Sequence, residues 1–138
     1  MTGIYYHTID AKGRLFIPAR LREELGDVFY VTLSMDKCLS AFSSESWAVF
    51  TDKINAMPMA RQRRFRPVLS HALKCVLDGQ GRALLTQTLR TFAGLDKRVT
   101  IVGVGERAEF WDSDAFEVVD AQETTPEYIA NVFEELEV

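Results

Sequence analysis

The sequence contains few of the residues that build metal centres and catalytic sites. Its 138 residues include only two cysteines, Cys38 and Cys75, and two histidines, His7 and His71. No C-x-x-C or H-x-x-E-H spacing combines them into a zinc site, and no nucleophile motif gives either histidine a Ser, Cys or carboxylate partner. We therefore expect two buried free thiols in a reducing compartment, no metal, no cofactor and no enzymatic activity.

Long apolar runs are also lacking. No stretch approaches the roughly 18 apolar residues that a membrane-spanning helix requires, and residues 1–10 lack the basic-then-apolar pattern of a signal peptide. We expect a cytoplasmic protein that binds neither a membrane nor a small-molecule substrate. One nucleotide-like pattern, G-x-G-x-x-A at residues 103–108, continues into an expected strand instead of a helix, so we interpret it as a hairpin turn.

Charge is plentiful but unevenly distributed. The net charge is −4, yet residues 106–138 carry eleven acidic side chains and one arginine, so residues 1–105 are positive overall. Two basic clusters stand out, the first with only Asp10 among its neighbours and the second with no acid: Lys12, Arg14, Arg20 and Arg22, and then Arg61, Arg63, Arg64 and Arg66. The acidic average therefore does not argue against a polyanionic partner.

The chain contains one unit twice. The segment Asp10-Ala-Lys-Gly-Arg14 recurs as Asp78-Gly-Gln-Gly-Arg82, and Leu21-Arg22 returns as Leu89-Arg90 at the same offset of 68. A duplicated fold is the simplest explanation. Domains of that size bury only about 60% of their unfolded-chain surface. We therefore expect the two halves to share one core, or the chain to be an obligate oligomer.

Each copy has the pattern of a β-β-α-β-β unit with a trailing helix. β-branched and aromatic residues bounded by turn residues predict strands at residues 4–9, 14–17, 28–33, 38–42, 72–77, 82–85, 98–103 and 107–111. Short helices are expected from Pro18 to Leu25 and over residues 87–93, and longer ones over residues 44–56, from Ser113 and from Thr125-Pro126.

The expected fold is mainly β with short helices. One unit has too few strands to close a barrel, so we expect the two copies to interleave their hairpins around a pseudo-two-fold axis. The expected boundaries are residues 4–56 for the first repeat, 57–71 for a connector that Pro67 interrupts, 72–122 for the second repeat and 123–138 for a C-terminal helix. Apolar residues of that last helix are spaced to form one stripe.

The repeated D-x-x-G-R turns form the candidate site. The aspartate can accept hydrogen bonds from turn amides, the glycine can adopt a positive φ, and the arginine follows at the rim of the sheet. A guanidinium there can grip phosphate or read guanine O6 and N7 in the major groove. The alternative is an ion pair that only holds the turn closed. The site residues are Asp10, Lys12, Gly13 and Arg14 in the first copy and Asp78, Gln80, Gly81 and Arg82 in the second.

These turns and their surroundings give the chain a resemblance to a known family. It resembles the MraZ family of bacterial transcriptional regulators, which are built from two SpoVT-AbrB-type repeats. The likeness covers nearly the whole chain and is carried by residues 7–22, 75–82, 93–96, 102–107 and 111–112. The resemblance implies a swapped-hairpin β-barrel, a ring-shaped homo-oligomer and sequence-specific binding of double-stranded DNA. The implied target is a set of short direct repeats upstream of the division and cell-wall gene cluster to which the regulator belongs.

The family motif D-x-x-x-R, which is associated with DNA binding, falls here on Asp10 with Arg14 and on Asp78 with Arg82. The chain departs from the family pattern at Thr86, where proline is common. It departs again over residues 61–72, where the family usually has a smoother apolar helix. The second departure bears on how subunits meet.

We therefore expect a nucleoid-associated repressor of its own operon. The rival interpretation is a protein-interaction module, antitoxin-like, whose basic hairpins bind an acidic protein partner. Lys12 adds a charge that Gln80 lacks. Arg20, Arg22 and Arg90 either supplement the turns or are solvated helix residues, and we favour the second. The cluster Arg61–Arg66 either reaches DNA or pairs with the acidic C-terminal region of a neighbouring subunit.

Overall fold

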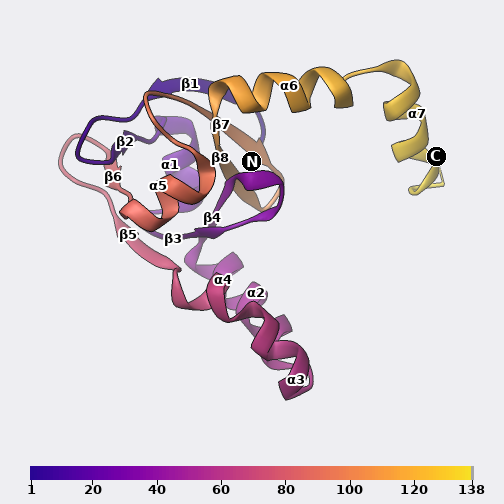
Figure 1. Ribbon diagram of the computed structural model, residues 1–138, viewed down its shortest axis with the longest axis horizontal. Helices are drawn as coiled ribbons and strands as arrows, with labels where there is room; N and C mark the ends of the chain where they lie inside the picture. Colours follow the sequence, from indigo (N-terminus) through magenta and orange to yellow (C-terminus); the bar gives the residue numbers. More distant parts are fainter. Residues whose placement is uncertain (138) are drawn as a thin grey trace.

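The strands of the computed structural model, which describes residues 1–137, form one large and one small antiparallel sheet (Figure 1). The large sheet has the order β1-β7-β8-β4-β3-β5, and the small one pairs β2 with β6. The strands are β1 (Ile4–Thr8), β2 (Arg14–Phe16), β3 (Val28–Leu33), β4 (Leu39–Ser43), β5 (Leu73–Val76), β6 (Arg82–Leu84), β7 (Arg98–Val104) and β8 (Arg107–Asp112). These match the strands predicted from the sequence to within one or two residues.

Helices follow the strands in the same order in both repeats. They are α1 (Ala19–Leu25), α2 (Ser44–Asn55), α3 (Met59–Gln62), α4 (Arg66–Ser70), α5 (Gln87–Ala93), α6 (Ser113–Glu123) and α7 (Pro126–Glu134), with short 3-10 turns η1 (Met35–Lys37) and η2 (Arg63–Phe65). The helix α1 begins one residue after Pro18, which takes the capping position instead of the first helical one. At the equivalent place in the second repeat, the Thr86 hydroxyl accepts a hydrogen bond from the Leu89 amide and caps α5. Thr86 therefore begins its helix by a different physical route from proline.

The repeats exchange their first strands, as the sequence predicted. The strand β1 pairs with β7 of the second repeat, and β5 pairs with β3 of the first. Under the pseudo-two-fold operation β1 becomes β5, β3 becomes β7 and β4 becomes β8, so the axis runs between the paired strands β4 and β8. It also passes through the β2–β6 pair, where Leu15 faces Ala83. Neither repeat has a complete sheet of its own, which explains why about 68 residues suffice for each.

The core lies between this pair of sheets and the two short helices. Its fully buried side chains come from both repeats and include Leu15, Leu21, Phe29, Leu89 and Phe110. Because burying one such side chain stabilises a protein by about 1.5–3 kcal/mol, the shared core favours the interleaved arrangement over two separate units. The fold class predicted from the sequence, mainly β with interleaved tandem repeats, is confirmed.

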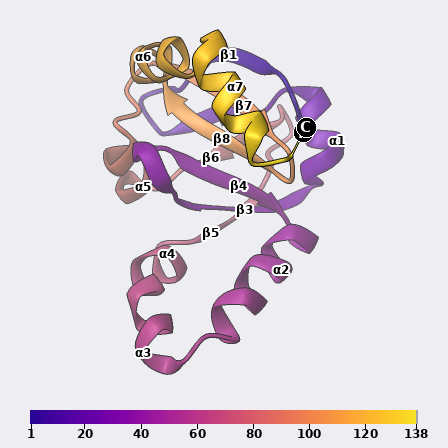
Figure 2. The same ribbon diagram turned by 90° about the vertical axis from the view of Figure 1, so that its right-hand side faces the viewer.

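A helical lobe made of α2, α3, η2 and α4 projects from one side of the sheet (Figures 1 and 2). Trp47 of α2 stacks on Tyr30 of β3 with 5.2 Å between ring centroids, and Phe50 stacks on Phe42 at 5.0 Å. The helix is thus held to the sheet by aromatic rings, which agrees with its predicted apolar side. The predicted interruption at Pro67 is also present, because the chain passes through η2 and restarts as α4 with Pro67 in the first turn.

Both cysteines are free and buried, as expected from the sequence. Burial raises the pKa of each thiol to about 12, and the Glu109 and Asp36 carboxylates contribute further at Cys38. Neither is therefore a thiolate near neutral pH, which fits a packing role.

Candidate nucleic-acid interface

The first D-x-x-G-R turn is closed by its aspartate. Asp10 Oδ1 accepts hydrogen bonds from the amides of Lys12 and Arg14, at 3.0 and 2.9 Å, and Asp10 Oδ2 accepts one from Arg14 Nε at 2.6 Å. The Gly13 amide donates to the Asp10 carbonyl, and Gly13 has a φ of +91°. These contacts, led by the Arg14 amide, lower the pKa of Asp10 below its ordinary value. The carboxylate is therefore charged near neutral pH and fixes both turn and arginine.

The second turn repeats the arrangement atom for atom. Asp78 Oδ1 accepts from the amides of Gln80 and Arg82, both at 2.9 Å, and Asp78 Oδ2 accepts from Arg82 Nε at 2.9 Å. Gly81 has a φ of +76°. The pKa of Asp78 is likewise lowered, first by the Arg82 amide. The ion pairs predicted as one alternative for these turns are thus present, and they use only the Nε atom of each arginine.

The other end of each guanidinium remains available. Within residues 1–137, the Nη atoms of Arg14 and Arg82 make no hydrogen bond, and both side chains are about one-third exposed. Each arginine is therefore oriented by its aspartate while two donor groups still face solvent. An ion pair that saturated the guanidinium would not leave them free.

The two turns are bonded to each other across the pseudo-two-fold axis. The Ile17 amide, just after β2, donates to the Gly81 carbonyl at 3.0 Å, and the Leu85 amide, just after β6, donates to the Gly13 carbonyl at 2.8 Å. In the strands between, Arg14 faces Leu84 and Arg82 faces Phe16. The spacing of the two arginines is therefore set by backbone pairing and not by a flexible linker.

Two helix arginines, Arg22 and Arg90, pack against the opposite turns. Arg22 of α1 lies over the Phe16 ring, 5.3 Å from its centroid, and a Cβ on Gly81 would meet its Nη1 atom at 2.5 Å. Arg90 of α5 donates from Nε to the Leu85 carbonyl at 3.2 Å, and a Cβ on Gly13 would meet that Nε at 2.7 Å. Our expectation that these residues are solvated is wrong, because each is partly buried against the other repeat's glycine.

The sequence contains a signal for this pair of arginines. The dipeptides Leu21-Arg22 and Leu89-Arg90 are kept in both copies, at the same offset as the turns. Leu21 and Leu89 are buried core residues, so the arginine beside each must lie at the edge of the buried face. By contrast, Arg20 is exposed on α1, as expected.

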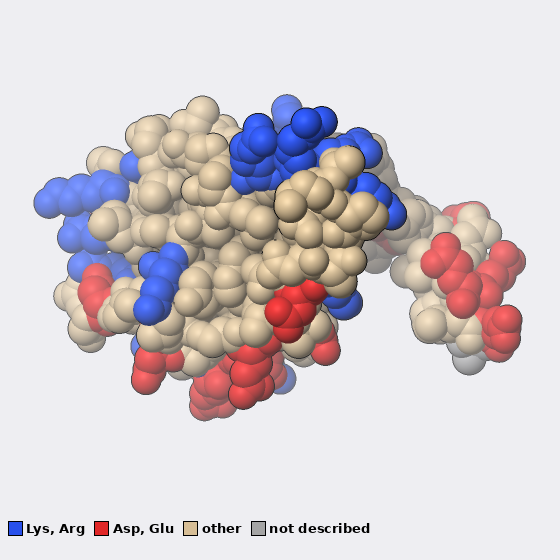
Figure 3. Space-filling model, turned by 90° about the horizontal axis from the view of Figure 1, so that it is seen from below, with Lys and Arg blue, Asp and Glu red and all other residues tan. Residues whose placement is uncertain are grey.

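The remaining candidate residues lie in two places. Lys12 and Gln80 are exposed at the tips of the turns, where β2 and β6 form one end of the molecule in Figure 1. Arg61, Arg63, Arg64 and Arg66 are exposed on the separate α3–α4 segment. Figure 3 shows basic side chains at both places and acidic ones on the protruding C-terminal helix. The structure does not bring the Arg61–Arg66 cluster to the turns.

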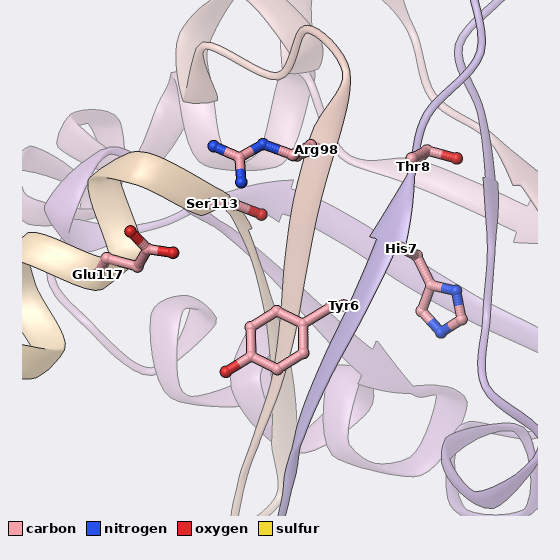
Figure 4. Close-up of a pocket in the computed structure, with 6 residues that line it drawn as sticks. All are labelled: Tyr6, His7, Thr8, Arg98, Ser113 and Glu117. Carbon is pink, nitrogen blue, oxygen red and sulfur yellow. The ribbon is translucent and has the colours of Figure 1, made fainter.

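A polar hollow of about 500 Å³ lies between β1, β7 and α6 (Figure 4). Tyr6 and His7 leave β1 on opposite sides, and His7 instead packs on Phe16 with 5.2 Å between ring centroids. Arg98 pairs with Asp114, and the Ser113 hydroxyl shares a hydrogen bond of 2.8 Å with Thr100. Arg98 and Ser113 are thus engaged in structural contacts, and neither belongs to a pair of nucleophile and base.

Two further features are absent from residues 1–137. This part of the chain holds no group of three or more His, Cys, Asp or Glu side chains placed to bind a metal ion. None of its helices combines the length and apolar character needed to cross a bilayer.

Comparison with known proteins identifies the family. The family model described as "MraZ protein, putative antitoxin-like" matches residues 1–65 and 68–129, one segment for each repeat. The chain belongs to the MraZ family. It is 51% identical over 115 residues to a protein of Carboxydothermus hydrogenoformans named "Transcriptional regulator MraZ", with 81% of this chain and 80% of that protein covered. Proteins of the same name from Alkaliphilus metalliredigens and Moorella thermoacetica are 43% and 46% identical, covering 97% and 93% of this chain and 96% and 91% of those proteins.

Family membership confirms the resemblance seen in the sequence. Both matched segments contain a complete D-x-x-G-R turn, the first through Asp10 and Arg14 and the second through Asp78 and Arg82.

Proposed function

We propose that the chain is a transcriptional regulator that binds double-stranded DNA through its paired D-x-x-G-R turns. It would recognise short direct repeats upstream of its own division and cell-wall gene cluster and repress that operon. A homo-oligomeric ring would present many turns at once, in the cytoplasm and on the nucleoid. The names of its relatives support the regulatory part of this proposal.

One observation carries the DNA contact. Arg14 and Arg82 are each held through Nε by an aspartate while their Nη atoms face solvent. A guanidinium held in this way loses little conformational freedom on binding and can still offer two parallel donors to a phosphate or to guanine O6 and N7. The aspartates would act as positioning residues. Each orients its arginine, and its own negative charge would repel a polyanion.

The second repeat contributes differently from the first. Lys12 would add a phosphate contact beside Arg14, whereas Gln80 in the equivalent position can only donate or accept neutral hydrogen bonds. One chain offers few contacts, so affinity would depend on several chains binding neighbouring sites together. Repeats about one helical turn apart would place successive chains on the same side of the duplex.

The test is binding of the full-length protein to a duplex from its own upstream region, followed by fluorescence anisotropy at several salt concentrations. Arg14→Ala and Arg82→Ala remove the proposed contacts. Lys53→Ala is the matched control, because it removes one positive charge from an exposed position of α2. We expect wild-type and Lys53→Ala binding to fall steeply with salt, with log K decreasing by about 0.9 per phosphate contact for each unit of log salt.

Each arginine variant should lose affinity in a way that reveals its contact. A lost base contact costs about 1–3 kcal/mol and relaxes sequence preference, whereas a lost phosphate contact weakens all sequences and reduces the salt slope by about 1. If both variants bind as well as Lys53→Ala does, the turns are not the DNA site. If the wild type shows no preference for its own upstream duplex over a scrambled one, the regulator function is wrong.

A second candidate function is supported by the family description, which includes the word antitoxin-like. In that case the same basic turns would bind an acidic protein partner. The arginine variants would then lose the partner in a pull-down from the native host, while the wild type would bind its upstream duplex no better than a scrambled one.

A further inference from the structure

The C-terminal helix α7 exposes an apolar stripe. Ile129, Val132 and Phe133 of α7 and Leu136 just after its end recur at helical spacing, and 45%, 39%, 53% and 70% of their surfaces are exposed. Thr125 caps the helix through its hydroxyl, so the helix has a defined start. An amphipathic helix that leaves such a stripe in water is far from its most stable arrangement.

The stripe has no cover within its own chain. Within residues 1–137, the neighbouring helix α6 is the only element with substantial contact to α7. Figures 1 and 2 show α7 projecting from the body in a different direction from the α2–α4 lobe. A partner for the stripe must therefore come from another molecule.

A groove of matching chemistry, called here the α2–α4 groove, lies between the α2–α4 lobe and the adjoining β3, η1 and α5. It has a volume of about 430 Å³ and is lined by Leu33, Met35, Phe50, Phe65, Val68 and Phe92 together with Ser34 and Pro67. Met35 and Phe92 are 74% and 40% exposed. Apolar side chains at i, i+3, i+4 and i+7 of a helix are the pattern by which helices bind such grooves.

The charges around the two surfaces are opposite. The groove shares Phe65 with a neighbouring hollow whose other lining residues are Arg61 and Arg64. Residues 123–137 contain Glu123, Glu127, Glu134, Glu135 and Glu137 and no basic residue. The view in Figure 3 shows acidic side chains on the protruding helix and basic ones on the lobe. A second copy of this chain supplies both the stripe and the charge that the groove lacks.

We propose that α7 of one subunit binds in the α2–α4 groove of a second copy of the same chain. The apolar stripe fills the groove, and the glutamates of α7 lie toward the Arg61–Arg66 cluster at its end. This inference rests on the self-association included in the proposed function, and it identifies the surfaces. Because stripe and groove are different surfaces, every bound pair leaves one of each free, and the contact continues until a ring closes or a filament forms.

The test measures the mass of full-length variants by mass photometry. Ile129→Asp with Phe133→Asp disables the stripe, and Met35→Asp with Phe92→Asp disables the groove, all at exposed positions. Val118→Asp on α6 and Val49→Asp on α2, combined in one variant, are the matched controls, because together they add the same two charges at valines that are 61% and 52% exposed. Each disabled variant should associate more weakly by roughly 30-fold or more, which is the scale of an interface hot spot.

Mixing the two disabled variants gives the sharper result. The mixture contains one intact stripe, on the groove variant, and one intact groove, on the stripe variant, so it should form pairs of chains and nothing larger. Circular dichroism checks that each variant is folded, and serine replaces aspartate at the same positions in any variant that is not.

The inference is overturned if the wild type is a monomer, if the stripe variant assembles like the wild type, or if the controls dissociate equally. It is also overturned if the mixture stays monomeric. Failure of the proposed function is separable, because Arg14→Ala and Arg82→Ala should keep the wild-type mass whether or not the protein binds DNA.

Discussion

Replacing Gly13 by alanine should damage the fold more than replacing Gly81, although the two glycines occupy equivalent turns. Both have a positive φ, of +91° and +76°, and a non-glycine residue there costs about 1–2 kcal/mol. The surroundings differ. A Cβ on Gly13 would lie 2.8 Å from the Leu85 carbonyl oxygen, which is backbone, whereas a Cβ on Gly81 would first meet the Arg22 guanidinium, the far end of a flexible side chain.

The backbone near Gly13 cannot easily retreat. Leu85 is 1% exposed, and its amide donates to the Gly13 carbonyl at 2.8 Å. Moving it would disturb both the core and the bond that joins the two repeats. Overpacking of this kind costs a further ~1–3 kcal/mol. We therefore expect Gly81→Ala to lower the free energy of unfolding by about 1–2 kcal/mol, and Gly13→Ala by that amount plus the overpacking cost.

Urea unfolding followed by circular dichroism, at one protein concentration for all variants, measures this difference. Gly79→Ala is the control, because it lies in the second turn, has no atom within 4 Å of its Cβ position and has no positive φ. It should leave stability unchanged or raise it by a few tenths of a kcal/mol. Equal losses for Gly13→Ala and Gly81→Ala, or a larger loss for the latter, would refute the argument from backbone and side-chain mobility.

Three further predictions concern titration, reactivity and packing. The pKa values of Asp10 and Asp78 are lowered in the folded protein, so the unfolded chain binds more protons and the stabilisation by these carboxylates is lost as pH falls below about 4. Asp10→Asn with Asp78→Asn should therefore make the free energy of unfolding, measured in urea, fall less steeply with decreasing pH. An unchanged slope of that free energy against pH would contradict the prediction. Cys38 and Cys75, whose pKa values burial raises to about 12, should react with a thiol reagent at pH 8 only after unfolding, and fast labelling of the folded protein would contradict burial. Leu15→Ala should cost about 2–5 kcal/mol of unfolding free energy, because Leu15 is fully buried at the pseudo-two-fold axis; a loss below 1 kcal/mol would mean that the core collapses around it.

The duplication made most of the fold predictable. Because Asp10–Arg14 matches Asp78–Arg82, each strand of one copy has a counterpart in the other, as do α1 with α5 and α2 with α6. Local pattern then predicts the strand and helix positions. The interleaving followed from size, because one repeat could not bury its own core. The exact strand partners, β1 with β7 and β5 with β3, join residues of different repeats, and no local pattern specifies them.

Local pattern failed where a residue's role depends on the other repeat. Arg22 and Arg90 look like exposed helix residues in sequence, and only the crossing of the repeats places them against Gly81 and Gly13. The sequence predicts a turn near Met35–Lys37 but not the positive φ that Asp36 and Lys37 both adopt there. The stripe on α7 was predicted from its spacing, but spacing alone does not say what covers it.

The crossing also bears on how the two turns would act on a partner. Each glycine carbonyl accepts a hydrogen bond from the strand exit of the other repeat, so neither turn can shift without disturbing its counterpart. Arg14 and Arg82 are therefore held at a fixed spacing by the β2–β6 pair as well as by their own aspartates. Two donors fixed in this way lose less freedom on binding than two independent side chains, and they favour a partner whose acceptors repeat at a matching distance. A duplex backbone has such regular spacing and a flexible acidic peptide does not, which supports the proposed contact with DNA over the rival proposal of an acidic protein partner.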